Sequence, residues 1–470
     1  MYECPNCNGN LKFDIPSQKL LCEYCGTQMD PYDFEKASDA NEITEDGFTV
    51  DVFTVNVFTC PQCGGELISN DTTAATFCSF CGGSTILDSR ISREKRPGYI
   101  IPFRKTKEDC KKAYGEMLRK APFAPSEFKD EEYISRFRSI YMPYWVYSFE
   151  KNGHVAFGGS RTERDGDYII KNNYTLECDV EAKYKGITFD AAASFSDELS
   201  NAIAPFEWRD AKPFTPAYLS GFYADTDDVV SQVYTEDART IVTQEMCNQI
   251  RQDSLFSRYQ LESDLVQAME PEMMQKELAM LPVWFLTYRR GDRVSYAVVN
   301  GQTGKVSGDI PVDKKKYLLG SLLLAVPLFL ILNLLVSMTA TTMLGVTAVL
   351  AAICCVISAV QKKALRDRET GEKDKGKQYS WNRDGSYTAN RGKMTVWKVL
   401  DAVKKPGIGL VLAAMVLLFH PVSDLYYYGA ALAVMGLAVW DILGMIERYN
   451  ILATRELPQF QKRGGDEYER

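Results

Sequence analysis

The sequence predicts a multidomain protein that combines two small cysteine-rich β modules, an α+β domain and α-helical hairpins that cross a membrane. Three observations predict this organisation. A CxxC-x14-CxxC pattern occurs twice near the N-terminus, and residues 318–360 carry no charge. The segment between these features alternates strand and helix patterns and is long enough for a sizeable core. A chain of 470 residues has room for several such domains.

Each copy of the cysteine pattern supplies four thiols, and four thiolates form the closed tetrahedral shell of a structural Zn²⁺ site. Gly26, Gly64, Gly82 and Asn8 stand where a CxxC turn favours a positive φ. Disulfide-bonded loops and a thiol redox switch are the alternatives, but CxxC pairs in a reducing compartment more often bind metal. We therefore predict two structural zinc ions in two β zinc ribbons. The predicted ligands are Cys4, Cys7, Cys22 and Cys25 in the first ribbon, and Cys60, Cys63, Cys78 and Cys81 in the second.

Charge argues against a nucleic-acid partner. The net charge is −8, and residues 30–51 carry eight acidic side chains with Lys36 as their only base. Such a segment repels phosphate. Only two histidines are present, His154 and His420, which nearly excludes histidine-based acid–base chemistry. The N-terminus has neither the basic nor the apolar region of a signal peptide, so we expect the ribbons to lie in the cytoplasm.

Two apolar blocks predict membrane helices. The first has no charged residue in 43 positions, which fits two spans of about 20 residues each, at 318–336 and 343–360. The second predicts spans near 406–420 and 425–446, and the former is short enough to be re-entrant or tilted. Buried core helices are the alternative for both blocks.

Basic residues predict the topology. Lys314, Lys315 and Lys316 precede the first span, and the loop 361–405 holds thirteen Lys and Arg against six Asp and Glu. By the positive-inside rule, the soluble parts and both termini of this multi-pass cell-membrane protein are cytoplasmic. The basic loop is either a solvated segment that fixes the orientation or a segment that lies against anionic lipid head groups.

Residues 98–312 predict an α+β domain. Helix patterns cover 105–120 and 225–251, and strand patterns cover 99–103, 140–149 with a break at Pro143, 167–172, 174–184 and 187–193. A hairpin pairs 283–288 with 294–299.

Three features of this domain resemble functional motifs. The run from Asn300 to Lys305 suggests a phosphate-binding loop, but it lacks the first glycine and lies between strands, so we interpret it as a turn. Gly158-Gly159-Ser160 is too short for a dinucleotide fingerprint, and we interpret His154 as a surface residue.

Several segments carry a resemblance to a known group. They are 99–103 (YIIPF), 140–146 (IYMPYWV), 214–224, 281–286 (LPVWFL), 299–306 and, in the second ribbon, 74–78 (AATFC). Over nearly the whole chain they resemble bacterial membrane proteins with N-terminal zinc ribbons like those of transcription factor B, which are common in Gram-positive bacteria. Some members are encoded beside phage-shock-type and SPFH-type membrane-stress proteins. The resemblance implies a membrane anchor that recruits cytoplasmic partners. The ribbons alone also resemble those of the replication-restart helicase, but nothing else in the chain supports a helicase.

The leading hypothesis is a zinc-binding, non-enzymatic membrane scaffold that recruits cytoplasmic proteins, in a membrane-stress response. One alternative is a membrane-tethered nucleic-acid regulator with a patch of Lys12, Phe13 and Lys19. A second is a small transporter or intramembrane enzyme. Its polar candidates within the apolar blocks are Asn333, Cys354, Cys355, His420 and Asp424.

Apart from the zinc ligands we predict no catalytic or cofactor-binding residue. The expected partners are membrane lipid and cytoplasmic proteins, nucleic acid is not expected, and the oligomeric state is left open. The predicted domains are zinc ribbons at 1–30 and 58–88, an acidic linker at 31–57, a cytoplasmic α+β domain at 98–312, transmembrane hairpins at 317–360 and 406–446, the basic cytoplasmic loop 361–405 and a cytoplasmic tail at 447–470.

Overall fold

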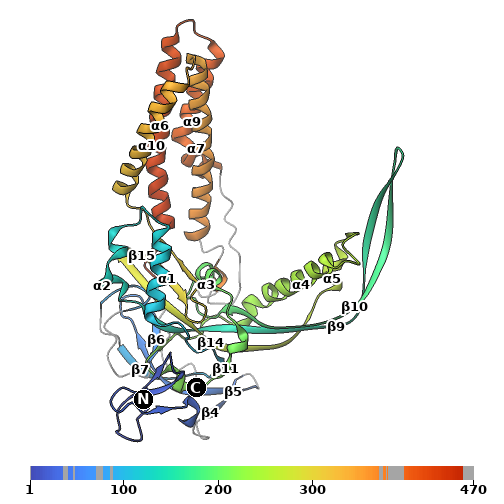
Figure 1. Ribbon diagram of the computed structural model, residues 1–470, viewed down its shortest axis with the longest axis vertical. Coiled ribbons are helices and arrows are strands. Elements are labelled where there is room, and N and C mark those ends of the chain that lie inside the picture. The colour runs from blue at the N-terminus through green and yellow to red at the C-terminus, as the bar shows by residue number, and fades with distance from the viewer. Residues whose placement is uncertain are drawn as a thin grey trace.

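The computed structural model describes residues 2–34, 41–45, 48–69, 78–84, 88–369, 374–376, 378 and 396–458. A mixed α/β body carries the N-terminal segments at its base, and a bundle of long helices rises from the opposite side (Figure 1). A long two-stranded hairpin leaves the body sideways and bends toward the side of the bundle (Figure 1). The fold therefore combines small cysteine-rich β regions, a large α+β body and apolar C-terminal helices.

The first cysteine-rich module is a separate three-stranded antiparallel sheet. Its first hairpin pairs Leu11 with Cys22 and Asp14 with Lys19. Gln18 enables the tight turn with φ 57°. The elements are β1 (Leu11–Asp14), β2 (Lys19–Cys22) and β3 (Gln28–Met29), followed by the 3₁₀ helix η1 (Pro31–Phe34).

The second cysteine-rich module is continuous with the large sheet of the body. Its strand β6 pairs with β12, which in turn pairs with β9 of the body. The segment 31–57, expected to be a linker, contains β4 and most of β5, because residues 48–59 are rich in β-branched and aromatic side chains that favour strands. Positions 35–40 and 46–47 of that segment lie outside the described residues. The strands are β4 (Asn41–Glu45), β5 (Phe48–Thr59), β6 (Glu66–Ser69) and β7 (Asp88–Lys95).

The body is organised around β9 and β14, which pair antiparallel over much of their length. Alternate residues of β9 serve two apolar cores, since Tyr141 packs on one face and Ile140 and Met142 on the other. The remaining strands extend this sheet. The bounds are β8 (Tyr99–Ile100), β9 (Arg138–Asp165), β10 (Tyr168–Asp190), β11 (Lys212–Pro213), β12 (Tyr223–Ala224), β13 (Gln260–Leu261), β14 (Glu272–Arg290), β15 (Arg293–Asn300), β16 (Val306–Gly308) and β17 (Arg455–Glu456).

Two strand predictions in the body were wrong in extent. Pro143 does not interrupt β9, because its carbonyl still accepts a hydrogen bond from the Ala191 amide at 2.8 Å. The segment 167–193, predicted as three strands, contains one long strand, β10, with a bulge between Tyr184 and Ile187. Gly186 at the bulge has φ 83°, a conformation that glycine adopts without strain.

Short helices cover the body. The predicted helix at 105–120 is confirmed as α1, which begins with a capping box of Thr106 and Asp109. The predicted helix at 225–251 begins only at Thr235, because the amides of Asp225 and Asp228 instead donate to the carbonyls of Tyr141 and Ala191. The bounds are α1 (Lys107–Arg119), α2 (Glu131–Ile134), α3 (Asp197–Ile203), α4 (Thr235–Gln252) and α5 (Asp264–Ala268), with 3₁₀ helices η2 (Ser126–Lys129), η3 (Trp208–Asp210), η4 (Pro216–Leu219) and η5 (Ser231–Tyr234).

In the described part of the chain, α6, α7, α9 and α10 make up the helical bundle, in which α7, α9 and α10 pack against one another. Three of them, α6, α7 and α10, are long and apolar enough to cross a membrane, whereas the apolar part of α9 is the shorter stretch Pro406–Phe419. Small side chains line the contact of α7, α9 and α10, as is common where helices approach closely in lipid. The bounds are α6 (Lys314–Leu335), α7 (Ala340–Glu369), α9 (Val396–Phe419) and α10 (Asp424–Leu452).

Ion pairs and a strand fasten the bundle to the body. Arg368 at the end of α7 and Arg455 after α10 both pair with Asp309, at 2.8 and 3.0 Å. Both also reach Glu198 on α3. β17 pairs with β15, so residues that follow the bundle helices in the sequence complete the body sheet. Positions 370–373, 377 and 379–395 of the predicted basic loop, and 459–470 of the predicted tail, lie outside the described residues.

Candidate metal centres and the surfaces around them

The first cysteine set gathers its sulfurs at two tight turns. Asn8 and Gly26 have φ 54° and 72°, and their amides donate to Cys4 and Cys22 carbonyls at 2.8 and 2.9 Å. The positive-φ residues predicted from the sequence therefore close the turns. The four Sγ atoms lie within 4.8 Å of one another; Cys4 and Cys25 are 3.5 Å apart, and Cys7 and Cys22 are 3.4 Å apart.

The second set repeats this arrangement. Gly64 and Gly82 have φ 76° and 68°, and their amides donate to Cys60 and Cys78 carbonyls. The four Sγ atoms again lie within 4.8 Å, with Cys60–Cys81 at 3.8 Å and Cys63–Cys78 at 3.7 Å. Residues 70–77, which include most of the 74–78 run, lie outside the described residues.

Both sulfur sets suit a bound metal. All eight thiols are free. A tetrahedral shell with Zn–S bonds of ~2.3 Å places its sulfurs about 3.8 Å apart, close to the separations seen here, whereas a disulfide would require about 2.05 Å. Each group can thus hold a zinc ion through four ligands, which leaves no coordination position open for catalysis.

The pKa is lowered for two thiols in each set, Cys4 and Cys25 in the first and Cys60 and Cys81 in the second. Hydrogen bonds from the Thr27 side chain and backbone lower the pKa of Cys25 to about 6. A hydrogen bond from the Cys78 thiol lowers the pKa of Cys60 to about 6, against the effect of burial. A lowered pKa favours the thiolate, which is the form that binds metal.

The two modules differ sharply in their exposure. Tyr24 lies between Cys22 and Cys25, and its side chain is 80% exposed. Phe80 holds the equivalent place between Cys78 and Cys81 but is 1% exposed. All four cysteines of the second set are buried, whereas Cys7 and Cys25 of the first are exposed. The second site is thus a part of the body core, and the first presents its metal turns to solvent.

Contacts with the body explain this difference for the second site. Phe80 packs against Phe285 with ring centroids 6.5 Å apart. The hydroxyl of Tyr296 donates to the Phe80 carbonyl at 2.6 Å, and Thr287 Oγ1 donates to the Ser79 carbonyl. The turn between Cys78 and Cys81 is therefore held by strands β14 and β15.

The first module is docked on the body by the opposite end of its hairpin. Phe13 is buried against Tyr218 and Phe222, with centroids 5.1 and 6.2 Å apart. Its amide donates to the Ser220 carbonyl at 3.0 Å, and the Ser220 hydroxyl donates to the Leu11 carbonyl. The surface patch proposed for Lys12, Phe13 and Lys19 was therefore wrong for Phe13, which serves the core. Lys12 is paired with Glu23 at 3.0 Å.

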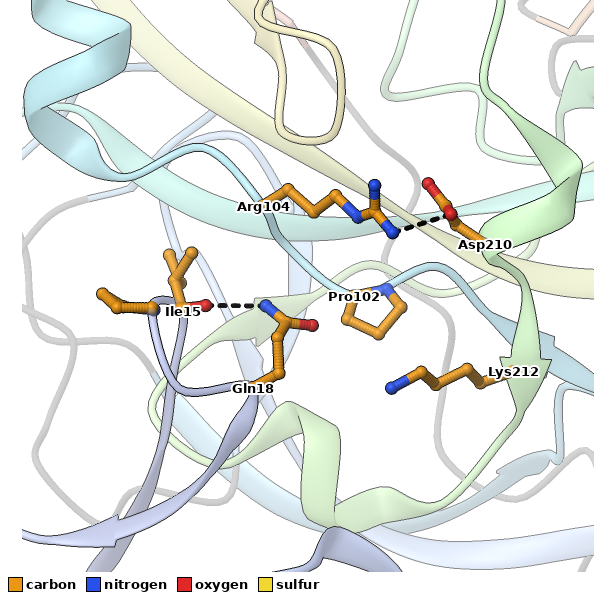
Figure 2. Close-up of a pocket in the computed structure, with 7 residues that line it drawn as sticks. Ile15, Gln18, Pro102, Arg104, Asp210 and Lys212 are labelled. Carbon is orange, nitrogen blue, oxygen red and sulfur yellow. Dashed lines mark hydrogen bonds and ion pairs between the residues drawn. The ribbon is translucent and has the colours of Figure 1, made fainter.

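A pocket lies where this hairpin meets the body (Figure 2). Its volume is about 420 Å³, and Ile15, Pro16 and Gln18 of the module face Pro102, Arg104, Asp210 and Lys212 of the body. Gln18 Nε2 donates to the Ile15 and Phe103 carbonyls at 2.7 Å each. Arg104 is paired with Asp210 at 2.7 Å, and the two charges offset each other at the edge of the pocket.

The other three motifs of the α+β body lie in ordinary turns and strands. Asn300 Oδ1 accepts from the Gln302 and Thr303 amides at 2.9 Å each, which confirms that 300–305 is a turn. His154 is an exposed residue on β9, and its Nδ1 lies 3.0 Å from Asp179 of β10; this raises the pKa of the imidazole. Gly158, Gly159 and Ser160 lie within β9.

The body contains a buried carboxyl cluster that was not predicted from the sequence. Asp190 and Asp197 are both buried, and Asp190 Oδ2 has no hydrogen-bond partner among the described residues. Burial, together with the negative charges of Asp197 and Asp374, holds the pKa of Asp190 well above its usual range. Asp197 accepts from the Tyr234 hydroxyl at 2.7 Å and from the Lys375 amide at 2.8 Å. No local pattern marks these residues, because the three segments that they join are far apart in sequence.

The bundle holds a second polar group that was missed. Asp441 on α10 is buried and accepts from Ser358 of α7 at 2.6 Å and from Arg448 at 3.2 Å. A charge inside the predicted span 425–446 was the available signal. Among the five earlier candidates, His420 and Asp424 lie at the turn between α9 and α10, Cys354 and Cys355 lie within α7, and the side chain of Asn333 lies outside the described part of the structure.

Comparison with known proteins gives one informative relative. The chain is 28% identical over 319 residues to the uncharacterized protein YdjG of Bacillus subtilis (strain 168), an alignment that covers 67% of this chain and 91% of that protein. No protein-family model matches the chain. No solved structure matches it either. The relative has no described activity to transfer, so function must be argued from the residues.

Proposed function

We propose that this protein is a zinc-binding integral membrane scaffold whose soluble parts and termini are cytoplasmic and whose first ribbon recruits cytoplasmic protein partners without enzymatic chemistry. The exposed Tyr24 carries this proposal. The Tyr24 ring is 80% exposed and lies on a metal-binding turn of a ribbon that is itself docked on the body. Such an exposed, rigidly held aromatic ring has the character of a protein-interaction hot spot. The identical position in the second ribbon is filled by core packing, so exposure at Tyr24 is not required by the ribbon fold.

Zinc is the metal that the ligand set favours. Four thiolates in a tetrahedral arrangement select zinc or an iron–sulfur centre over hard cations such as magnesium or calcium. A single tetrahedral metal fits the 3.4–3.8 Å sulfur separations within each set. The role is structural, because the closed shell supplies no reactive position.

Basic side chains support the proposed membrane orientation. Lys314 to Lys316 begin α6, and Arg366 and Arg368 end α7, all at the body end of the bundle. The two turns at the far end, 336–339 and 420–423, carry no Lys or Arg. The positive-inside rule then places the body in the cytoplasm. Reporter fusions at positions 338 and 422 are expected to report an external location, and cytoplasmic readouts there would contradict this orientation.

The alternative functions have less support. A nucleic-acid surface on the first ribbon would need exposed basic residues, yet residues 1–34 contain two lysines against five acidic residues. An intramembrane transport or catalytic site is disfavoured at Asp441, because its carboxylate is already paired with Arg448 and Ser358. The membrane-stress setting rests only on the family resemblance.

Capture of partners from solubilised membranes tests the proposal. The wild-type chain is expected to retain a reproducible protein that Tyr24→Ala loses and that removal of zinc also releases. Ile91→Ala is the matched control, because that side chain is 73% exposed but lies on β7, outside the first ribbon. Recruitment through the first ribbon would be contradicted if Tyr24→Ala retained every captured protein. A salt-dependent shift of DNA by the full chain would also contradict it.

A further inference from the structure

The hairpin of β9 and β10 continues well beyond the support of the body. The last contact with another strand is made by β13, whose residues pair with Gly159 and Ser160. From Arg161 to Lys171 every described residue is exposed, and the two strands pair only with each other. We call residues 161–171 the arm tip. Gly166, with φ 57°, makes its turn.

The arm tip carries apolar side chains that nothing in the described chain covers. Tyr168 is 76% exposed and Ile169 is 74% exposed, and Ile170 is also exposed. Because side chains alternate along a strand, Tyr168 and Ile170 lie on one face of the hairpin and Ile169 on the other. An isolated two-stranded hairpin is marginally stable in water, and three consecutive exposed apolar residues add no packing to it. Their arrangement suits contact with an apolar layer that meets the tip end-on.

The direction of the arm identifies this layer. The hairpin bends toward the side from which the helical bundle rises, and its tip reaches a level between the two ends of the bundle (Figure 1). A bilayer that surrounds α6, α7 and α10 would extend outward to the arm tip at the same level. On the premise of the proposed function, that these helices span a membrane, we propose that the arm tip contacts the interfacial layer of the same membrane and forms a second, peripheral attachment away from the bundle.

The composition of the tip fits a shallow contact. Tyrosine is favoured at the head-group level, where its ring meets acyl chains and its hydroxyl meets water. The tip has three basic residues, Arg161, Arg164 and Lys171, and three acidic residues, Glu163, Asp165 and Asp167. Arg161 pairs with Glu163 at 3.0 Å. The carboxylates at the turn keep it in the polar head-group layer. With no net charge, the tip gains little from anionic lipids, so the contact is expected on phosphatidylcholine alone.

Photo-crosslinking in a defined membrane tests this contact. The full-length protein is reconstituted into phosphatidylcholine vesicles with p-benzoylphenylalanine in place of Ile169, Ile91 or Val356, one position at a time. Ile91 is the matched control, since it is 73% exposed and its strand, β7, lies on the side of the body away from the bundle (Figure 1). Val356 on α7 is 63% exposed and reports whether the helices lie in lipid.

The proposal predicts lipid adducts at 169 at several times the yield at 91, with the same yield when anionic phosphatidylglycerol is added. Lipid adducts at 356 with none above the Ile91 level at 169 would overturn the arm contact and leave membrane insertion standing. Crosslinks from 169 to a second copy of the chain would also overturn it and assign the arm to self-association. An absence of lipid adducts at all three positions would overturn both the arm contact and the membrane function on which it rests.

Discussion

Tyr24 and Phe80 occupy the same place in two cysteine repeats of identical spacing, yet the first side chain is 80% exposed and the second 1% exposed. The relationship separates the roles of the two metal sites. Phe80 makes its site a part of the body core, in contact with β14 and β15. Tyr24 is exposed, on a ribbon whose opposite end is docked on the body through Phe13, Leu11 and Gln18. The two sites share the same four-cysteine ligand set, but we expect them to differ in zinc release and in their effect on the stability of the body.

We expect the two zinc ions to differ in lability. Protein purified without chelators should contain one ion for each of the two cysteine groups. A chelator should remove the ion of the first group sooner, because Cys7 and Cys25 are exposed and all four cysteines of the second group are buried. Metal analysis by mass spectrometry during chelation gives the measurement. Release of both ions at one rate would show that the difference in burial does not control metal access.

The ligand variants should separate in the same way. Cys7→Ser is expected to remove one zinc while the body keeps its unfolding temperature. Cys63→Ser should lower the unfolding temperature of the body, because the second group lies within its core. Equal effects of the two variants on thermal unfolding would contradict the assignment of the second site to the core.

Phe13→Ala should undock the first ribbon. Removal of a buried phenylalanine ring costs about 3–5 kcal/mol in well-packed cores, and here the lost contacts are those with Tyr218 and Phe222. Hydrogen exchange is expected to increase at Ser220 and along β1, while zinc content stays unchanged. Tyr24→Ala on the same ribbon is the control and should change stability by less than about 0.5 kcal/mol, because its ring is exposed. Unchanged exchange in Phe13→Ala would mean that other contacts hold the ribbon.

Asp309→Ala should weaken the joint between bundle and body. It leaves Arg368 and Arg455, both largely buried, without their shared carboxylate. Loss of one partner of a buried ion pair costs roughly 3–5 kcal/mol, and the remaining contacts to Glu198 reduce that figure. Glu198→Ala is the control and should cost less than about 1 kcal/mol, because that carboxylate is mostly exposed. Thermal unfolding in detergent distinguishes the two variants, and equal losses would contradict the central role of Asp309.

Asp190→Asn should change how stability depends on pH. The pKa of Asp190 is raised in the folded state, so the folded chain binds a proton that the unfolded chain releases near pH 4. The free energy of unfolding of the wild type therefore falls as pH rises from about 4 through the folded-state pKa. Asparagine stays neutral and removes this loss, so the variant should gain unfolding temperature relative to wild type between pH 5 and pH 8, a range above the unfolded value of about 4. Parallel pH profiles of the two proteins would show that Asp190 is ionised in the fold.

Local chemistry made part of this structure predictable. The glycines and Asn8 of the CxxC turns, the hairpin of β14 and β15, and the helices of the bundle all follow from neighbouring residues, since turn geometry and helix hydrophobicity are set within a few positions. The gathering of each cysteine set also follows, because its spacing alone restricts where the sulfurs can meet.

The other features could not be predicted because they depend on packing between residues that are far apart in the sequence. Phe13 and Tyr24 are similar aromatic residues in one short ribbon, and only the position of Ser220 and Tyr218, some 200 residues later, decides which of them is buried. The joining of β5 and β6 to the body depends on β12 in the same way. Asp190 and Asp197 meet Lys375 across a comparable separation, so no window of sequence contains the cluster.

The pairing of β17 with β15 sets an order on assembly during synthesis. Arg455 and Glu456 of β17 pair with a sheet whose other strands precede α6. The strand that covers this edge of β15 therefore leaves the ribosome only after the bundle helices. Domains generally fold as the chain emerges, N-terminal parts first. In this protein the edge of β15 at Arg293 and Val294 instead stays open until the chain beyond α10 has been made and its C-terminal segment reaches the body.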